Sequence, residues 1–181
     1  PVITLAEPAD FETEIKRSRF VARCARVDSP EEGRAFVEGH RQVEASHNAW
    51  AYRIDGAVRF SDDGEVGGTA GRPILHAIEG QELDHVVCLV IRYYGGVKLG
   101  AGGLTRAYGG AAAACLRDAR RLEVLPTVVI RVLVPFDFTG AVFPLLSHHG
   151  VERLDETWEP VGLHLVLKIE EPSLGAFEQA L

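Results

Sequence analysis

An apolar run followed by a glycine-rich segment constrains the fold of this 181-residue chain most strongly. The run Val86–Ile91 is rich in β-branched residues and lacks polar alternation, which is typical of a strand buried on both faces. The segment Tyr94–Leu104 follows and contains five glycines. Small residues line one face of Leu104–Ala119, which predicts a helix packed closely on a sheet. The segment therefore predicts a strand–loop–helix unit in an α+β fold.

Upstream of this unit, local patterns predict a strand and a helix. Alternation over Phe20–Ala25 predicts a half-buried strand. Ser29 has the features of an N-cap, because proline follows it and Glu32 stands three residues further on to close a capping box. We expect this helix to continue to about Ala45.

A β-hairpin is predicted immediately after this helix. Trp50–Ile54 and Val58–Phe60 both alternate in polarity, and Asp55-Gly56 separates them. Glycine accepts the positive φ of a two-residue hairpin turn, so this sequence indicates two adjacent antiparallel strands.

The chain is predicted to divide into two domains, residues 1–122 and 127–181. Pro126 interrupts the pattern there, and a β-α-β-β-α order follows, as in a ferredoxin-like α/β sandwich without its last strand. We therefore expect the natural chain to continue beyond Leu181. The expected elements are strands Val128–Val134, Val151–Trp158 and Leu163–Ile169, and helices Phe138–His149 and Ser173–Leu181.

Charge and cysteine usage limit the class of protein. The net charge of −7 is uneven, since residues 1–121 contain 16 basic and 17 acidic residues, whereas residues 122–181 contain 3 and 9. An anion-binding site is therefore expected in the first part. The three cysteines are far apart and lack a C-x-x-C motif, which favours buried thiols in a reducing cytoplasm over disulfides or a metal site. No apolar run is long enough for a membrane span, and no secretory signal is visible.

The glycine-rich segment is a candidate anion site. A glycine loop that leads into a helix presents free backbone N–H groups, and Arg92, Lys98 and Arg106 flank this one. The Walker A pattern does not fit, because Ala101-Gly102 stands where that pattern requires Lys and Ser or Thr. The pattern G-x-G-x-x-G does not fit either, because Thr105 stands where its third glycine would fall. The alternative is that these glycines only permit tight turns and close helix packing.

An acidic segment offers a second candidate site. Asp62, Asp63 and Glu65 could bind a divalent cation, form an acid/base pair or bind a polar ligand. They could equally form a loop that caps a helix beginning near Ala70. His47 is either a base or hydrogen-bonding group of the same site, or a partly buried histidine with a structural role.

Four motifs together resemble the IMPACT/YigZ family. They cover residues 16–117 and include two departures, since Val66 stands where the family usually has proline and Tyr94 where phenylalanine is commoner. The resemblance implies an N-terminal domain like the second domain of ribosomal protein uS-five and a C-terminal ferredoxin-like domain. Eukaryotic IMPACT proteins are regulators of translation. The motifs are Lys16–Phe20, His47–Arg53, Asp62–Gly71 and Arg92–Tyr108.

We accordingly predict a non-catalytic binding module in translation, contacting RNA, the ribosome or a regulatory protein through one cleft, with no cofactor, catalytic residue or metal. The alternatives are an enzyme or sensor for a small phosphorylated or carboxylated ligand, and a protein-interaction scaffold. The predicted binding residues are His47, Asn48, Asp62, Asp63, Glu65, Thr69, Arg92, Tyr93, Tyr94, Gly95, Gly96, Lys98, Gly102, Gly103 and Arg106.

Overall fold

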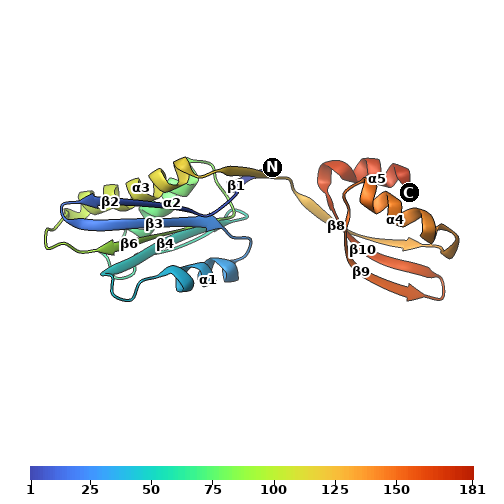
Figure 1. Cartoon of the computed structure of the whole chain (residues 1–181), viewed down its shortest axis with the longest axis horizontal. Coiled ribbons are helices and arrows are strands. Elements are labelled where there is room, and N and C mark those ends of the chain that lie inside the picture. The colour runs from blue at the N-terminus through green and yellow to red at the C-terminus, as the bar shows by residue number, and fades with distance from the viewer. The chain divides into compact units, whose positions relative to one another are not determined.

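The computed structural model describes all 181 residues and has two compact units. The N-terminal unit spans Val2–Val124 and the C-terminal unit Leu125–Leu181. Each unit combines a sheet with helices (Figure 1), which confirms the predicted α+β, two-domain layout.

The N-terminal unit is built on a five-stranded antiparallel sheet with the strand order β2-β3-β6-β4-β5. Helix α1 lies on one face of this sheet and α2 and α3 on the other (Figure 1). Its elements are β1 (Val2–Leu5), β2 (Ala9–Ile15), β3 (Ser18–Arg26), α1 (Pro30–His40), β4 (His47–Ile54), β5 (Ala57–Ser61), α2 (Gly71–Gly80), β6 (Val86–Tyr93), α3 (Gly100–Asp118) and β7 (Arg121–Val124).

The central strand β6 has a core on each side, which explains its uninterrupted apolar sequence. Every residue from Val86 to Arg92 is buried. Phe20 packs edge-on against Tyr108 in the core under α2 and α3, where both side chains are fully buried. On the other face, Gly33 of α1 lets the helix approach the ring of Tyr52. The buried strand predicted from the sequence is confirmed.

Two predicted helix boundaries were wrong. Helix α1 ends at His40, five residues before the expected end. Ser29 is its N-cap as predicted, but the Glu32 carboxylate accepts a hydrogen bond from the backbone N–H of Asp28, one residue before the cap, so the capping box is displaced. Helix α3 begins at Gly100, four residues earlier than predicted. Glycine has a low helix propensity, but the packing of the later turns of this helix outweighs that preference in its first turn.

The hairpin prediction is confirmed, and an upstream turn was missed. Asp55 and Gly56 both have positive φ and connect β4 to β5. Lys16 and Arg17 also have positive φ and connect β2 to β3. No glycine or asparagine marks that second turn, so the sequence offered no signal for it.

Strands β1 and β7 were not predicted. They pair antiparallel, with Val2 opposite Val124, so the two ends of the N-terminal unit lie together. Each strand has four residues, too few for a periodic pattern, and their partnership depends on a contact across more than one hundred residues.

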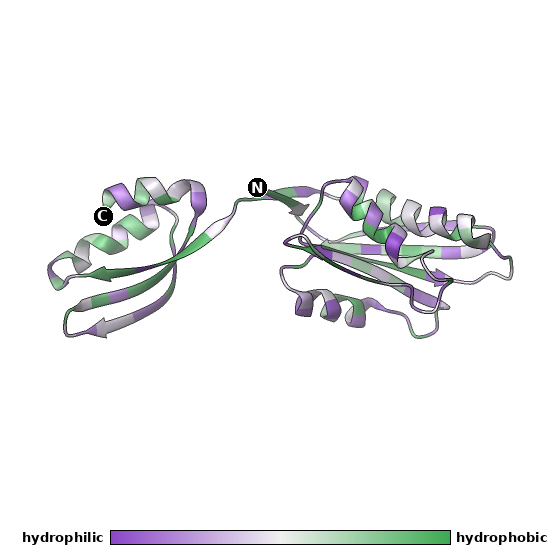
Figure 2. Ribbon diagram, turned by 180° about the vertical axis from the view of Figure 1, so that it is seen from behind, coloured by the Kyte–Doolittle hydropathy of each residue, from purple (hydrophilic) through white to green (hydrophobic).

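The C-terminal unit has the predicted β-α-β-β-α order. Its sheet is antiparallel with the order β8-β10-β9, and one hydrophobic core contains Leu163, Leu165 and Phe177. Figure 2 shows β8 mainly in hydrophobic colours and β9 mainly in hydrophilic ones. The elements are β8 (Thr127–Val134), η1 (Phe136–Phe138), α4 (Thr139–His148), β9 (Glu152–Glu159), β10 (Gly162–Glu170), η2 (Glu171–Ser173) and α5 (Leu174–Ala180).

The three cysteines are free and fully buried, as expected for small core residues. Burial raises the pKa of the Cys24 thiol, and its hydrogen bonds to the neighbouring Cys115 and Cys88 thiols raise it further. None of the helices is both long and apolar enough to cross a membrane.

Candidate functional site

A pocket of about 500 Å³ lies where the acidic segment, the start of β4 and the glycine-rich segment meet. We call it the Glu65 pocket. Its lining combines a few polar side chains with an apolar wall. The lining residues are Ser46, His47, Glu65, Val66, Arg92, Tyr94, Lys98, Leu99, Gly100, Ala101 and Leu104.

A buried ion pair forms the floor of this pocket. Arg92 Nη1 lies 3.0 Å from Glu65 Oε1 and 2.9 Å from Glu65 Oε2, and both side chains are nearly inaccessible. The Nε and Nη2 groups of Arg92 are both 3.3 Å from Ser18 Oγ. Because its guanidinium is already partnered, Arg92 does not present a free cation to a phosphate.

Tyr108 of helix α3 supports the Glu65 carboxylate without lining the pocket. Its hydroxyl donates a hydrogen bond of 2.5 Å to Glu65 Oε2. Burial and the neighbouring Glu65 carboxylate raise the pKa of Tyr108 well above its usual range, so the phenol stays protonated as a donor. Tyr108 is not among the predicted binding residues, although the motif Arg92–Tyr108 contains it.

His47 is oriented by the acidic loop. Its Nδ1 atom lies 2.9 Å from the backbone carbonyl oxygen of Asp63, and its Nε2 atom lies 3.5 Å from Glu65 Oε1. The Asp63 carboxylate accepts a hydrogen bond of 2.6 Å from the backbone N–H of Asn48. The Asn48 amide bonds in turn to the backbone N–H and carbonyl of Gln42. Asp63 and Asn48 thus hold His47 without lining the pocket.

Asp62 serves as the cap of helix α2. Its carboxylate accepts hydrogen bonds from the backbone N–H groups of Gly68, Ala70 and Gly71. Partial burial raises the pKa of Asp62, but these three donors outweigh burial and hold it below its usual value. The helix-capping alternative considered for the acidic segment therefore describes Asp62.

The remaining predicted residues occupy several places. Thr69 donates its hydroxyl proton to the carbonyl of Val66 and stabilises the acidic loop. Tyr93 lies under the Arg19 guanidinium, 4.8 Å from the ring centre, among the residues packed against the core on the α1 side. Arg106 lines a separate pocket together with Lys16. The structure thus does not bring all the predicted residues to one pocket.

Two of the predicted glycines lie in the first turn of α3, and two lie before it. Gly102 and Gly103 belong to the helix, and neither is among the residues that line the Glu65 pocket. A Cβ atom on Gly95 would lie 1.9 Å from the carbonyl oxygen of Arg17, so this position admits only glycine. Gly96 has φ of +90°, which favours glycine. Close packing, which is the structural alternative to an anion site, therefore explains why glycine stands at position 95.

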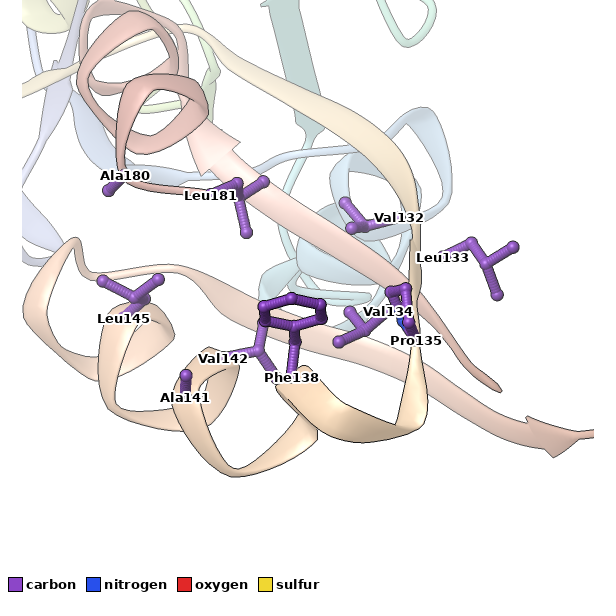
Figure 3. A pocket seen from close by; sticks show the side chains of 10 residues that line it. All are labelled: Val132, Leu133, Val134, Pro135, Phe138, Ala141, Val142, Leu145, Ala180 and Leu181. Atoms are coloured by element: carbon purple, nitrogen blue, oxygen red, sulfur yellow. The ribbon is translucent and has the colours of Figure 1, made fainter. Parts of the chain in front are cut away.

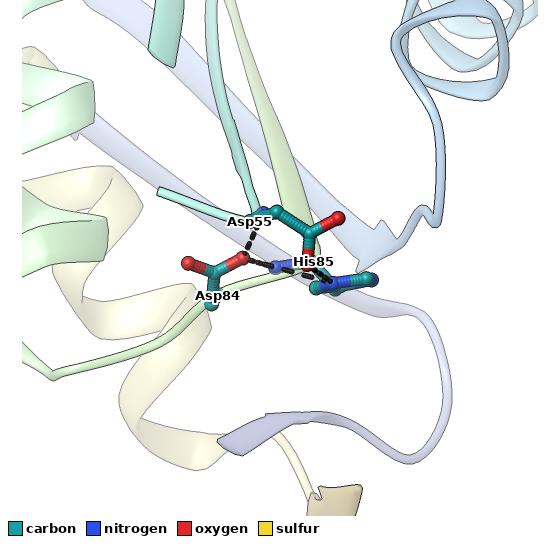
Figure 4. A group of neighbouring side chains, drawn as sticks. All are labelled: Asp55, Asp84 and His85. Atoms are coloured by element: carbon teal, nitrogen blue, oxygen red, sulfur yellow. Dashed lines mark hydrogen bonds and ion pairs between the residues drawn. The ribbon is translucent and has the colours of Figure 1, made fainter. Parts of the chain in front are cut away.

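A second polar cluster, which the sequence did not indicate, joins the β4–β5 turn to the start of β6 (Figure 4). His85 lies 2.7 Å from Asp55 and 2.9 Å from Asp28, while the Asp84 carboxylate accepts hydrogen bonds from the backbone N–H groups of Asp55 and Gly56. Burial lowers the pKa of His85, but its bonds to Asp28 and Asp55 outweigh burial and raise it. Arg53 also lies 3.3 Å from Asp84, so basic side chains in this cluster pair with the acidic ones. We call this cluster of paired charges the His85 clamp.

The C-terminal unit has a pocket of about 480 Å³ between β8, α4 and the end of α5 (Figure 3). Its lining includes Phe138, Val142 and Leu145 and contains no titratable side chain. It therefore offers apolar contact but no group for catalysis or charge recognition.

Comparison with known proteins identifies the family. The Impact N-terminal domain profile matches residues 16–116, which is more than half of the chain. The chain belongs to the IMPACT family. An IMPACT family member of Thermus thermophilus is 52% identical over 155 residues, covering 86% of each chain. The Escherichia coli IMPACT family member YigZ is 42% identical over 121 residues, or 62% of this chain and 59% of YigZ.

A solved structure has the same fold across both units. The crystal structure of a hypothetical protein superimposes with a TM-score of 0.85 and 29% identity, covering 98% of this chain and 89% of that one. The IMPACT family resemblance predicted from the sequence is thus confirmed, and membership supports a regulatory role at the level of the family.

Proposed function

We propose that this IMPACT family protein is a non-catalytic binding module that acts in the regulation of translation, and that the Glu65 pocket contacts RNA, either free or within the ribosome. The observation that carries the proposal is the unpaired charge of Lys98. This exposed lysine lines the pocket and takes part in no ion pair, whereas Arg92 beside it is neutralised by Glu65. An unpaired cation at a pocket rim is suited to a phosphate group.

Tyr94 adds a surface for a base. Tyr94 is 49% exposed as a whole residue, and the Arg92 guanidinium lies 5.3 Å from the centre of its ring. Exposed aromatic rings beside basic groups bind unpaired bases by stacking, independently of sequence. The N-terminal unit is nearly neutral despite the acidic chain, so local positive charge is not overwhelmed there.

The second candidate is a small phosphorylated or carboxylated ligand in the same pocket. Its volume of about 500 Å³ lies in the range of small-molecule sites, and Val66, Leu99 and Leu104 supply apolar contact. Lys98 would bind the anionic group in this case as well.

Fluorescence anisotropy with a short single-stranded RNA tests the proposal. We expect binding at about 50 mM salt that weakens steeply towards 200 mM, and a Lys98→Ala variant whose salt slope is lower by about one. Lys168→Ala is the matched control, because Lys168 lies in the C-terminal unit and its loss changes the net charge equally. Absence of RNA binding at low salt contradicts the proposal, and stabilisation by inorganic phosphate in a thermal-shift assay would then favour the small-ligand alternative.

A further inference from the structure

We infer that single-stranded RNA crosses from the Glu65 pocket into a neighbouring basic pocket, so that the N-terminal unit contacts successive phosphates of one strand. This inference rests on the proposed function and adds a second site for the RNA backbone. The neighbouring pocket, which we call the Arg106 pocket, has a volume of about 280 Å³. Its lining residues are Ile15, Lys16, Leu99, Gly103, Arg106 and Ala107. Leu99 also lines the Glu65 pocket, so the two pockets adjoin.

Four basic side chains around these two pockets have no acidic partner. We call them the basic track: Lys16, Arg17, Lys98 and Arg106. All four residues are exposed, and none of them takes part in an ion pair. The chain contains no aspartate or glutamate from Tyr94 to Arg117, so the loop and helix that carry Lys98 and Arg106 supply no compensating charge. The track is thus a local concentration of positive charge on an acidic chain.

Packing brings the parts of the basic track together. A Cβ atom on Gly102 would lie 3.3 Å from Arg106 Nη1, so the Arg106 guanidinium extends back over the first turn of α3. A Cβ atom on Gly95 would lie 2.7 Å from the Cβ atom of Arg17, so the β2–β3 turn packs against the loop that precedes α3. The turn, the loop and the helix therefore present their basic side chains next to one another.

The β2–β3 turn holds its two basic residues against backbone preference. Lys16 and Arg17 have φ of +46° and +68°, a region in which glycine and asparagine are favoured. Non-glycine residues held in this region gather at ligand-binding sites. Because side chains alternate along a strand and Ile15 lines the Arg106 pocket, Glu14 points to the opposite face of β2 and does not offset Lys16. The charge of Lys16 therefore remains available to a ligand.

The two pockets suit different parts of a nucleotide chain. The Glu65 pocket combines Lys98 with the exposed Tyr94, which suits a base and its phosphate. The Arg106 pocket is smaller than an ordinary small-molecule site and offers two cations, so it suits a backbone phosphate rather than a separate ligand. A basic groove beside an aromatic ring is the arrangement that binds single strands independently of sequence. An acidic protein segment would use the cations but leave Tyr94 without a base.

Fluorescence anisotropy with one labelled RNA strand of about eight nucleotides tests the inference. The full chain is titrated between about 50 and 200 mM salt. Each phosphate contact adds to the salt slope, so Lys16→Asn/Arg106→Gln should lower the slope by about two and Lys98→Ala by about one. These substitutions are compatible with the fold, because asparagine tolerates positive φ and glutamine is a good helix former.

Two further double variants control for net charge and for folding. Arg59→Gln/Arg117→Gln removes the same charge from exposed residues of the same unit that form no ion pair, and it should leave the slope unchanged. Arg59 lies on β5, at the opposite edge of the sheet from β2, and Arg117 lies in the last turn of α3. Lys16→Arg/Arg106→Lys keeps both charges and should keep the slope.

The outcomes separate this inference from the proposed function. An unchanged slope in Lys16→Asn/Arg106→Gln, together with a lower slope in Lys98→Ala, overturns the inference and leaves the proposed function intact. Equal losses in both charge-removing double variants also overturn it, because binding would then follow net charge alone. Displacement of the strand by poly-glutamate as effectively as by unlabelled RNA overturns it in favour of an acidic protein segment. Absence of RNA binding by the unmodified protein at about 50 mM salt overturns both.

Discussion

Glu65 and Arg92 form an ion pair whose side chains are only 5% and 6% exposed. The pair joins the acidic loop to the end of the central strand, and Tyr108 and Ser18 satisfy further hydrogen bonds of the two charged groups. Such a pair is retained in the interior only when its partners are well placed, because each isolated charge would be costly to bury.

Removal of Glu65 is therefore expected to destabilise the N-terminal unit strongly. Glu65→Ala leaves the Arg92 guanidinium buried with Ser18 as its remaining side-chain hydrogen-bond partner, which should lower the free energy of unfolding by about 3–5 kcal/mol. Urea denaturation measures this change. Glu12→Ala is the control, because its ion pair with Arg19 is exposed and should contribute less than about 1 kcal/mol. A similar effect of both substitutions would contradict the role assigned to Glu65.

Tyr108→Phe isolates one hydrogen bond of this network. The ring remains packed on Phe20, but the donor to Glu65 is lost, so the free energy of unfolding should fall by about 1.5–3 kcal/mol.

The raised pKa of Tyr108 also predicts that the stability of the N-terminal unit depends on pH. Since the Tyr108 phenol releases its proton near pH 10 in the unfolded chain but not in the folded one, the free energy of unfolding should decrease above about pH 10. In the Tyr108→Phe variant this alkaline loss should be smaller, as denaturation at several pH values would show.

Gly95 is predicted to be intolerant of any side chain. A Cβ atom there meets the Arg17 carbonyl oxygen at 1.9 Å, so Gly95→Ala must displace the β2–β3 turn and should cost about 3 kcal/mol or more. Gly110→Ala on α3 is the matched control. Nothing lies within 4 Å of its Cβ position, and alanine favours a helix, so this variant should be neutral or up to about 1 kcal/mol more stable. Thermal unfolding of the two variants would distinguish packing from backbone preference, and equal effects would refute the close approach at Gly95.

His85 predicts a second dependence of the free energy of unfolding on pH. Its folded pKa is raised by Asp28 and Asp55, so the protonated form stabilises the fold. This contribution is fully present below the unfolded pKa of about 6.5 and is lost as pH rises through the folded value. The Asp28 pKa is lowered by its bonds to Arg26 and His85 despite partial burial, so its contribution disappears as pH falls below the unfolded value of about 4.

The clamp should therefore be strongest between these limits. His85→Gln is expected to remove the loss of stability between about pH 6 and pH 8, whereas the exposed His76→Gln should retain it. Proton NMR titration of the His85 ring gives the pKa directly. A ring that titrates below an ordinary histidine would contradict the clamp.

Local sequence determined most secondary structure, because the decisive interactions are close in the chain. Asp55-Gly56 accept positive φ and therefore form a hairpin turn wherever they are placed between alternating strands. Ser29 caps α1 through a neighbour only three residues away. The apolar sequence of β6 required burial on both faces whatever covers it.

Side-chain roles that depend on distant partners could not be derived in this way. Asp62 and Glu65 stand three residues apart in one acidic loop, yet Asp62 caps a helix while Glu65 pairs with an arginine of the central strand. Arg92 was selected as a phosphate ligand because it flanks the glycine-rich segment. Only its burial beside Glu65 shows that its charge is already neutralised.

The sequence by itself thus determined the family, the α+β class and the position of the main helices and strands, since hydrophobic periodicity and turn chemistry act over a few residues. The tertiary structure decided which polar side chains face the Glu65 pocket and which only hold it in place. Charge and hydrogen bonding depend on the dielectric surroundings and on partners from other elements. Those surroundings exist only once β4, β6, α3 and the acidic loop have come together.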